Sequence, residues 1–134
     1  MSRPAAADDQ LYREYILDHY KNPRNFGRLY NPDITHEENN PLCGDVVAMD
    51  FRVQDGIIED IRFHGRGCAI SQASASLLTE RLKGMSLENA KRINKDDVIR
   101  ELGIEISPAR IKCALLSLKV LKVGAYGLAG DDEE

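Results

Sequence analysis

The strongest pattern in the chain is an alternation of apolar and polar positions with a period of two. It covers residues 47–53 and returns over residues 57–64, and the turn-forming sequence Gln-Asp-Gly separates the two runs. This pattern predicts a β-hairpin with one apolar face. A weaker pattern before Asn40 indicates a third strand, but residues 31–41 are dense in Asn and Pro, which is typical of a loop. We expect His36, within that stretch, to be exposed to solvent.

Apolar residues recur at helical spacing in residues 8–23, before the hairpin. Asp8 or Asp9 is the expected N-cap, and Pro23 ends the predicted helix. The expected apolar face consists of Leu11, Tyr15, Ile16, His19 and Tyr20. On such an aromatic face we expect His19 to be packed or hydrogen-bonded rather than to bind a ligand.

Helical patterns fill the chain after the hairpin. Residues 71–84 are rich in small side chains, and Gly84 is the expected stop. Two short helices follow, and the last helix has Pro108 at its first helical position. The expected N-caps are Ser71, Ser86, Asn94 and Ser107. Strands followed by helices predict an α+β fold, with the helices packed mainly on one face of an antiparallel sheet.

Length and composition suit one domain over residues 1–134, and we expect residues 1–7 and 128–134 to be flexible. The net charge of -4, from 18 basic and 22 acidic residues, gives no electrostatic footprint for nucleic acid or an anionic membrane. No apolar run approaches the roughly 20 residues that span a bilayer. The first residues contain no apolar signal-peptide region, so we expect a cytoplasmic protein.

The chain contains three cysteines, Cys43, Cys68 and Cys113. An odd number without a secretory signal argues against a disulfide framework. Taken singly, each thiol is equally well explained as a small buried hydrophobe. Cys43 and Cys68 flank the predicted hairpin, whose two ends lie close together. All three thiols converge if the last helix, which carries Cys113 in its first two turns, begins at that same end of the sheet.

The residues around the thiols favour metal binding. Gly44, between Cys43 and Asp45, can turn both side chains toward one point. Cys68 follows Gly67 and precedes a helix N-terminus, where backbone amides and the helix dipole favour a thiolate. Three thiolates and one carboxylate form a four-ligand set that suits tetrahedral zinc or iron.

Two neighbouring side chains leave alternatives open. Lys112 is either a solvated helix lysine or a cation that offsets the negative charge of the site and holds Cys113 as a thiolate. His64 is a rival to Asp45 as the fourth ligand, but its position on the second hairpin strand favours a side chain that points away.

Four motifs resemble the U-type iron–sulfur scaffold family, which includes IscU, SufU and the N-terminal domain of NifU. They are LYREYILDHYKNPRNFG, NPLCGD, GCAISQASASLLTE and ARIKCALL, and together they cover nearly the whole chain in order. The resemblance implies an α+β fold with a three-stranded sheet. It implies that Cys43, Asp45, Cys68 and Cys113 bind a metal ion or a transient 2Fe–2S cluster. It also implies a cysteine desulfurase as sulfur donor and apo-proteins as cluster acceptors.

The chain combines markers of two branches of that family. IscU-type members have a His before the third cysteine and a Leu-Pro-Pro-Val-Lys segment that an Hsp70-type chaperone reads. Here the sequence is Ile-Ser-Pro-Ala-Arg-Ile-Lys-Cys, with Lys112 in place of that His. This resembles SufU and argues against a dedicated Hsp70-type chaperone. The connection from Cys68 to Cys113, however, is short and resembles that of IscU, because the extra segment usual in SufU is missing.

Three functions are compatible with these residues. The first is a scaffold, not itself an enzyme, on which an iron–sulfur cluster forms with Asp45 as a weak and labile ligand. The second is a zinc-bound sulfur acceptor, in which Cys113 or Cys43 leaves the metal and attacks the persulfide of a desulfurase. The third is a structural zinc module, but closed structural sites favour four Cys or His ligands, which counts against it.

Overall fold

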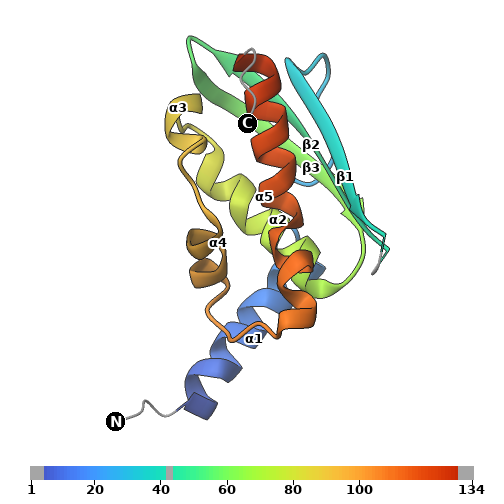
Figure 1. Ribbon diagram of the computed structural model, residues 1–134, viewed down its shortest axis with the longest axis vertical. Coiled ribbons are helices and arrows are strands. Elements are labelled where there is room, and N and C mark those ends of the chain that lie inside the picture. Colours follow the sequence, from blue (N-terminus) through green and yellow to red (C-terminus); the bar gives the residue numbers. More distant parts are fainter. Residues whose placement is uncertain (1–4, 42–43, 130–134) are drawn as a thin grey trace.

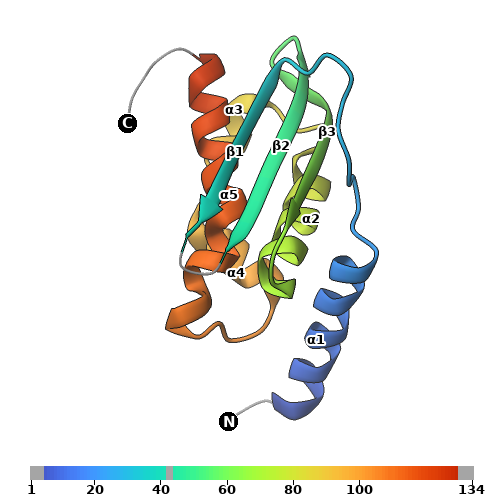
Figure 2. The same cartoon turned by 90° about the vertical axis from the view of Figure 1, so that its right-hand side faces the viewer.

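The computed structural model describes residues 5–41 and 44–129, with side chains for residues 11–41 and 44–125. Its elements are α1 (Ala5–Lys21), β1 (Ile34–Asn40), β2 (Asp45–Gln54), β3 (Ile57–Arg66), α2 (Ala69–Leu82), α3 (Leu87–Ala90), α4 (Lys95–Leu102) and α5 (Pro108–Ala129). Within these ranges the strands form one antiparallel sheet in the order β1-β2-β3. In Figure 2 the helices α2, α3, α4 and α5 lie behind this sheet, and α1 lies beside it. The predicted α+β architecture is therefore confirmed.

The strands β2 and β3 form the predicted hairpin. Their register pairs Gln54 with Ile57 across a two-residue turn. Both turn residues, Asp55 and Gly56, have positive φ, at 55° and 77°, as type I′ turns require. The largest side chains buried on the face toward the helices are Met49, Phe51 and Phe63. This apolar face forms one side of the main hydrophobic core.

The strand β1 is better formed than its sequence suggests. Residues 34–40, whose composition is typical of a loop, pair with β2 along their whole length. The prediction of an exposed His36 is wrong, because its side chain is half-buried near Gly124 of α5 and its Nε2 lies 2.6 Å from Oε2 of Glu38. Pairing with β2 and cover by α5 outweigh the polar sequence, which shows how strongly strand formation depends on context.

The helix α1 differs from its prediction in two respects. It begins at Ala5, before the expected cap at Asp8 or Asp9, so part of the expected flexible arm is helical. Its expected apolar face is only partly buried: Ile16 and His19 are covered, whereas Leu11, Tyr15 and Tyr20 are exposed. The reason is its position, since α1 packs on α2 at the outer side of the molecule (Figures 1 and 2) and only a narrow stripe is covered.

The helix α2 is buried along most of its length because it lies between the sheet, α1 and α5 (Figure 1). Its small side chains allow these neighbours to approach, and its hydroxyls find internal partners. Ser74 Oγ donates to the carbonyl of Ala114 at 2.7 Å. Ser76 Oγ lies 2.8 Å from Nδ1 of His19, which confirms the prediction of a hydrogen-bonded histidine.

The start of α2 lies earlier than predicted. Cys68 is the cap residue, without a side-chain cap hydrogen bond, and the helix begins at Ala69. The expected cap, Ser71, instead lies within the first turn, where its hydroxyl donates to the carbonyl of Cys68 at 3.2 Å. Other boundaries agree with prediction: Ser86 and Asn94 cap α3 and α4, and α5 begins at Pro108. In the described ranges, none of the helices has the length and apolar content to span a membrane.

Candidate functional site

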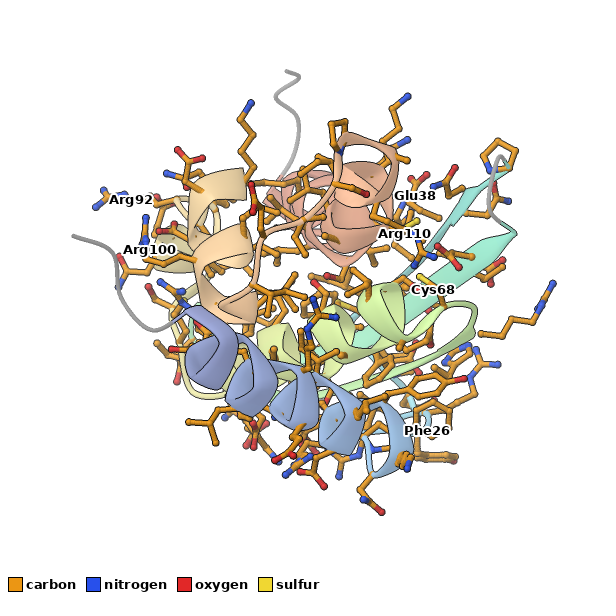
Figure 3. All side chains as sticks on the ribbon, turned by 90° about the horizontal axis from the view of Figure 1, so that it is seen from below. Phe26, Glu38, Cys68, Arg92, Arg100 and Arg110 are labelled. Atoms are coloured by element: carbon orange, nitrogen blue, oxygen red, sulfur yellow. The ribbon has the colours of Figure 1, made fainter. Side chains whose placement is uncertain are left out.

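Three donor side chains from separate elements meet where β2 begins and β3 ends. The ligand atoms of Asp45, Cys68 and Cys113 lie within 4.8 Å of one another. Asp45 is the first residue of β2, Cys68 caps α2, and Cys113 lies in the first two turns of α5. Figure 1 shows α2 and α5 beginning at the same lower end, and Figure 3 views that end with Cys68 labelled. The orientation of α5, which the sequence left open, brings Cys113 to the other two residues.

The carboxylate of Asp45 is held by the N-terminal end of α2. Asp45 is 1% exposed, and its Oδ1 accepts the backbone N–H of Cys68 at 2.9 Å. Its Oδ2 lies 3.7 Å from Cys68 Sγ. This close approach needs a glycine at position 67, because a Cβ there would lie 2.2 Å from Asp45 Oδ1 and the backbone φ is +143°. The supporting role expected of Gly67 thus has a steric basis.

The turn between β1 and β2 is closed by a backbone hydrogen bond. The N–H of Gly44 donates to the carbonyl of Asn40 at 2.7 Å. Gly44 has a φ of 75°, a conformation that glycine adopts without steric cost. Cys43 lies outside the described residues, so its place beside Asp45 in the ligand set stays a prediction.

Cys113 is fully buried near the end of β1. Asn40, itself 7% exposed, donates its Nδ2–H toward Cys113 Sγ across 3.8 Å. Sequence reasoning missed this residue because an Asn-Pro pair is typical of a turn. The signal that could have found it is the pairing of β1 with β2, which sets Asn40 opposite Asp45.

Lys112 and His64 lie apart from the three converging donors. Lys112 is exposed and lines a groove of about 410 Å³ between α5 and the end of β1, and its influence on the site stays a prediction. Phe63 is buried toward the helices, so strand alternation places its neighbour His64 on the opposite face of the sheet from Asp45. His64 is not a member of the cluster, in agreement with the expected direction of its side chain.

The donor set is compatible with a tetrahedral metal ion. Zinc bonds of about 2.3 Å to sulfur and about 2.0 Å to oxygen separate the two ligand atoms by about 3.5 Å in tetrahedral geometry. The distance between Cys68 Sγ and Asp45 Oδ2 is 3.7 Å. Thiolates are soft ligands that suit zinc and the iron of iron–sulfur clusters. Cys43 stays the predicted fourth ligand.

The model of the family described as the NifU-like N terminal domain matches residues 11–131. The chain belongs to this family. The resemblance to U-type scaffolds is therefore confirmed.

Some relatives of this chain are named as scaffold proteins, and one is named as a sulfurtransferase. The zinc-dependent sulfurtransferase SufU of Bacillus subtilis is 42% identical over an alignment of 133 residues, and the match covers 87% of this chain and 90% of SufU. The iron–sulfur cluster assembly scaffold protein IscU of Escherichia coli is 43% identical over 115 residues, which cover 83% of this chain and 88% of IscU.

Solved structures of the NifU-like family agree with the fold. A putative iron–sulfur cluster assembly scaffold protein for the SUF system from Fervidobacterium islandicum is 30% identical, with a TM-score of 0.72 over 87% of this chain and 97% of that one. A NifU-like N-terminal protein from Brucella abortus is only 22% identical, yet has a TM-score of 0.75 over 92% of this chain and 98% of that one. The second likeness supports the architecture alone.

Proposed function

We propose that this protein accepts sulfur from a cysteine desulfurase and serves as a scaffold for transient iron–sulfur clusters that pass to apo-proteins. The observation that carries the proposal is the convergence of two buried residues, Asp45 and Cys113, with the half-buried Cys68. Thiolates bind iron of a cluster strongly, whereas a carboxylate binds it weakly, which suits a cluster that must leave. A protein that keeps its cluster would be expected to supply a fourth cysteine. The names of the IscU and Fervidobacterium relatives support the same function.

Sulfur acceptance requires a thiolate that attacks the outer sulfur of a partner's persulfide, and Cys113 or Cys43 is the expected nucleophile. A new S–S bond forms on the acceptor, the S–S bond of the partner breaks, and the partner's cysteine leaves as a thiolate, so no external oxidant or reductant is needed. Because Cys113 is fully buried, its attack would require the site to open. Carbon–sulfur cleavage stays with the desulfurase, which makes this chain a scaffold rather than an enzyme in its own right.

A second candidate function is a zinc-bound sulfur acceptor that stimulates the desulfurase without building a cluster. Two observations favour it: Lys112 precedes the third cysteine, as expected of SufU-like members, and a relative with 42% identity is named a zinc-dependent sulfurtransferase. The residues that would hold zinc are again Cys43, Asp45, Cys68 and Cys113. Bound zinc would keep the thiols deprotonated at neutral pH.

Metal and sulfide content separates the two functions. Protein purified without oxygen is analysed for iron, acid-labile sulfide and zinc, and is then incubated with a cysteine desulfurase and cysteine. A scaffold binds iron and sulfide together after reconstitution and transfers them to an apo-ferredoxin. A zinc-bound acceptor retains zinc, accelerates the desulfurase and forms no cluster. A protein that neither forms a cluster nor stimulates the desulfurase contradicts both functions.

A further inference from the structure

Asn40 contributes a buried side-chain amide next to a proposed ligand sulfur. Its Nδ2 lies 3.8 Å from Cys113 Sγ, and both residues are buried. An amide N–H is a donor, and a thiolate sulfur is an acceptor. The β1–β2 register also sets Asn40 directly opposite Asp45. Asn40, which is outside the proposed ligand set, is therefore paired with Asp45 in the sheet and also contacts Cys113.

We propose that Asn40 is a positioning residue that orients Cys113 Sγ and withdraws electron density from it when a metal ion or cluster is bound. The inference rests on the proposed function, in which Cys113 is a ligand. Hydrogen bonds from outside the ligand set orient the ligands and tune the metal–sulfur bond.

The backbone and the side chain of Asn40 have separable tasks. Its carbonyl accepts the N–H of Gly44 and closes the turn, which another residue at this position can also do. The side-chain amide donates toward Cys113 Sγ. Asn40→Leu keeps the branched shape of the side chain and removes the donor. Asn39→Leu makes the same change one residue earlier, where the side chain is exposed, and serves as the matched control.

Cobalt(II) bound to the protein reports the donor strength of sulfur through its sulfur-to-metal charge-transfer absorption. We expect Asn40→Leu to shift this band to longer wavelength, because the sulfur regains electron density. We also expect metal binding to weaken by about 10-fold, because the thiolate is no longer held in its orientation. Asn39→Leu should match the wild-type protein in both measurements. An unshifted band in Asn40→Leu, or equal shifts in both variants, overturns the inference. A wild-type protein that binds no cobalt contradicts the proposed site instead.

A measurement on the wild-type protein covers the case in which Asn40→Leu does not fold. The protein is loaded with an NMR-active cadmium isotope, and scalar coupling across the N–H···S bond is recorded. Splitting of the side-chain amide proton of Asn40, without splitting of that of Asn39, supports the inference. An unsplit Asn40 signal in cadmium-loaded protein overturns it.

Discussion

The backbone N–H of Cys68 donates to Asp45 Oδ1 at 2.9 Å and joins the cap of α2 to the first residue of β2. One carboxylate oxygen is thus held by the protein, while the other faces Cys68 Sγ at 3.7 Å. The carboxylate of Asp45 therefore keeps a hydrogen-bond donor, the N–H of Cys68, whether or not it binds a metal. In the proposed scaffold, this arrangement would let Asp45 leave the metal at little cost, because the carboxylate would not become an unpaired buried charge.

Asp45→Ala should still permit loading with a cluster or with sulfur, but should slow release to acceptors. The reason is that water or an exogenous thiol would occupy the position of the weak carboxylate ligand. The measurement is transfer from loaded protein to an apo-ferredoxin. Asp50→Ala is a suitable control, since Asp50 is equally buried but binds Leu29 N–H and the Thr35 hydroxyl instead.

Two results would contradict this role of Asp45. Transfer at the wild-type rate would mean that Asp45 is only a turn residue. Failure to load at all would make Asp45 an essential ligand and would favour the zinc-bound acceptor.

Cys43→Ser, Cys68→Ser and Cys113→Ser should each abolish assembly. A hydroxyl is a harder and far less acidic ligand than a thiol, so each change removes a soft ligand or the attacking thiolate. Iron and sulfide that remain after desalting are the measurement, and thermal unfolding establishes that each variant is folded. A variant that retains a full cluster removes its cysteine from the ligand set.

Gly67→Ala should weaken metal binding, because its Cβ would lie 2.2 Å from Asp45 Oδ1 and would push the carboxylate out of the site. Gly27→Ala is the matched control, since Gly27 has a similar φ of +129° but a Cβ at that position would meet no atom within 4 Å. Both variants should lose about 1–3 kcal/mol of stability from backbone strain. Zinc affinity, measured by competition with a chelating dye, should fall in Gly67→Ala alone. Equal affinity in the two variants would contradict a steric role for Gly67.

Removal of metal at neutral pH should lower the melting temperature. Metal bound only by the folded state adds about 4 kcal/mol at a concentration 1,000-fold above its Kd, which corresponds to a shift on the order of 10 °C for a chain of this size. Differential scanning calorimetry before and after chelation measures the shift. An unchanged melting curve, with loss of metal verified, would show that the site is not coupled to folding.

Acidification should destabilise the protein through His19. Burial lowers the pKa of this imidazole below its usual value, and Arg24 lowers it further against the opposing effect of Glu80. The unfolded state therefore binds more protons than the folded state as the pH falls below about 6.5, and stability falls by at most about 1.4 kcal/mol per pH unit. Above about pH 6.5, the contribution of neutral, buried His19 to stability should be fully present.

Urea unfolding in the presence of a chelator, at pH 8 and at pH 5.5, tests this pH dependence. His19→Gln can keep a hydrogen bond to Ser76 but does not titrate, so its stability should vary less with pH than that of the wild-type protein. A variant that loses as much stability as the wild type on acidification would exclude His19 as the cause.

Short-range signals predicted much of this fold. The hairpin follows from a period of two around a Gln-Asp-Gly turn, and the caps at Ser86 and Asn94 follow from local side-chain hydrogen bonds. Predictions failed where a distant element decides the environment. His36 is half-buried because β2 and α5 meet β1, and Tyr15 is exposed although α1 packs along α2.

By itself, the sequence determined the hairpin, the candidate ligands and the family to which the chain belongs, because each depends on residue types at close spacing. Tertiary structure alone decided that α5 begins beside the start of β2, and so brings Cys113 within 4.8 Å of Asp45 and Cys68. It also placed Asn40 against Cys113, a contact across 73 positions of the chain. The physical reason is that helix orientation and strand register are set by burial of the whole apolar face of the sheet, which no short segment encodes.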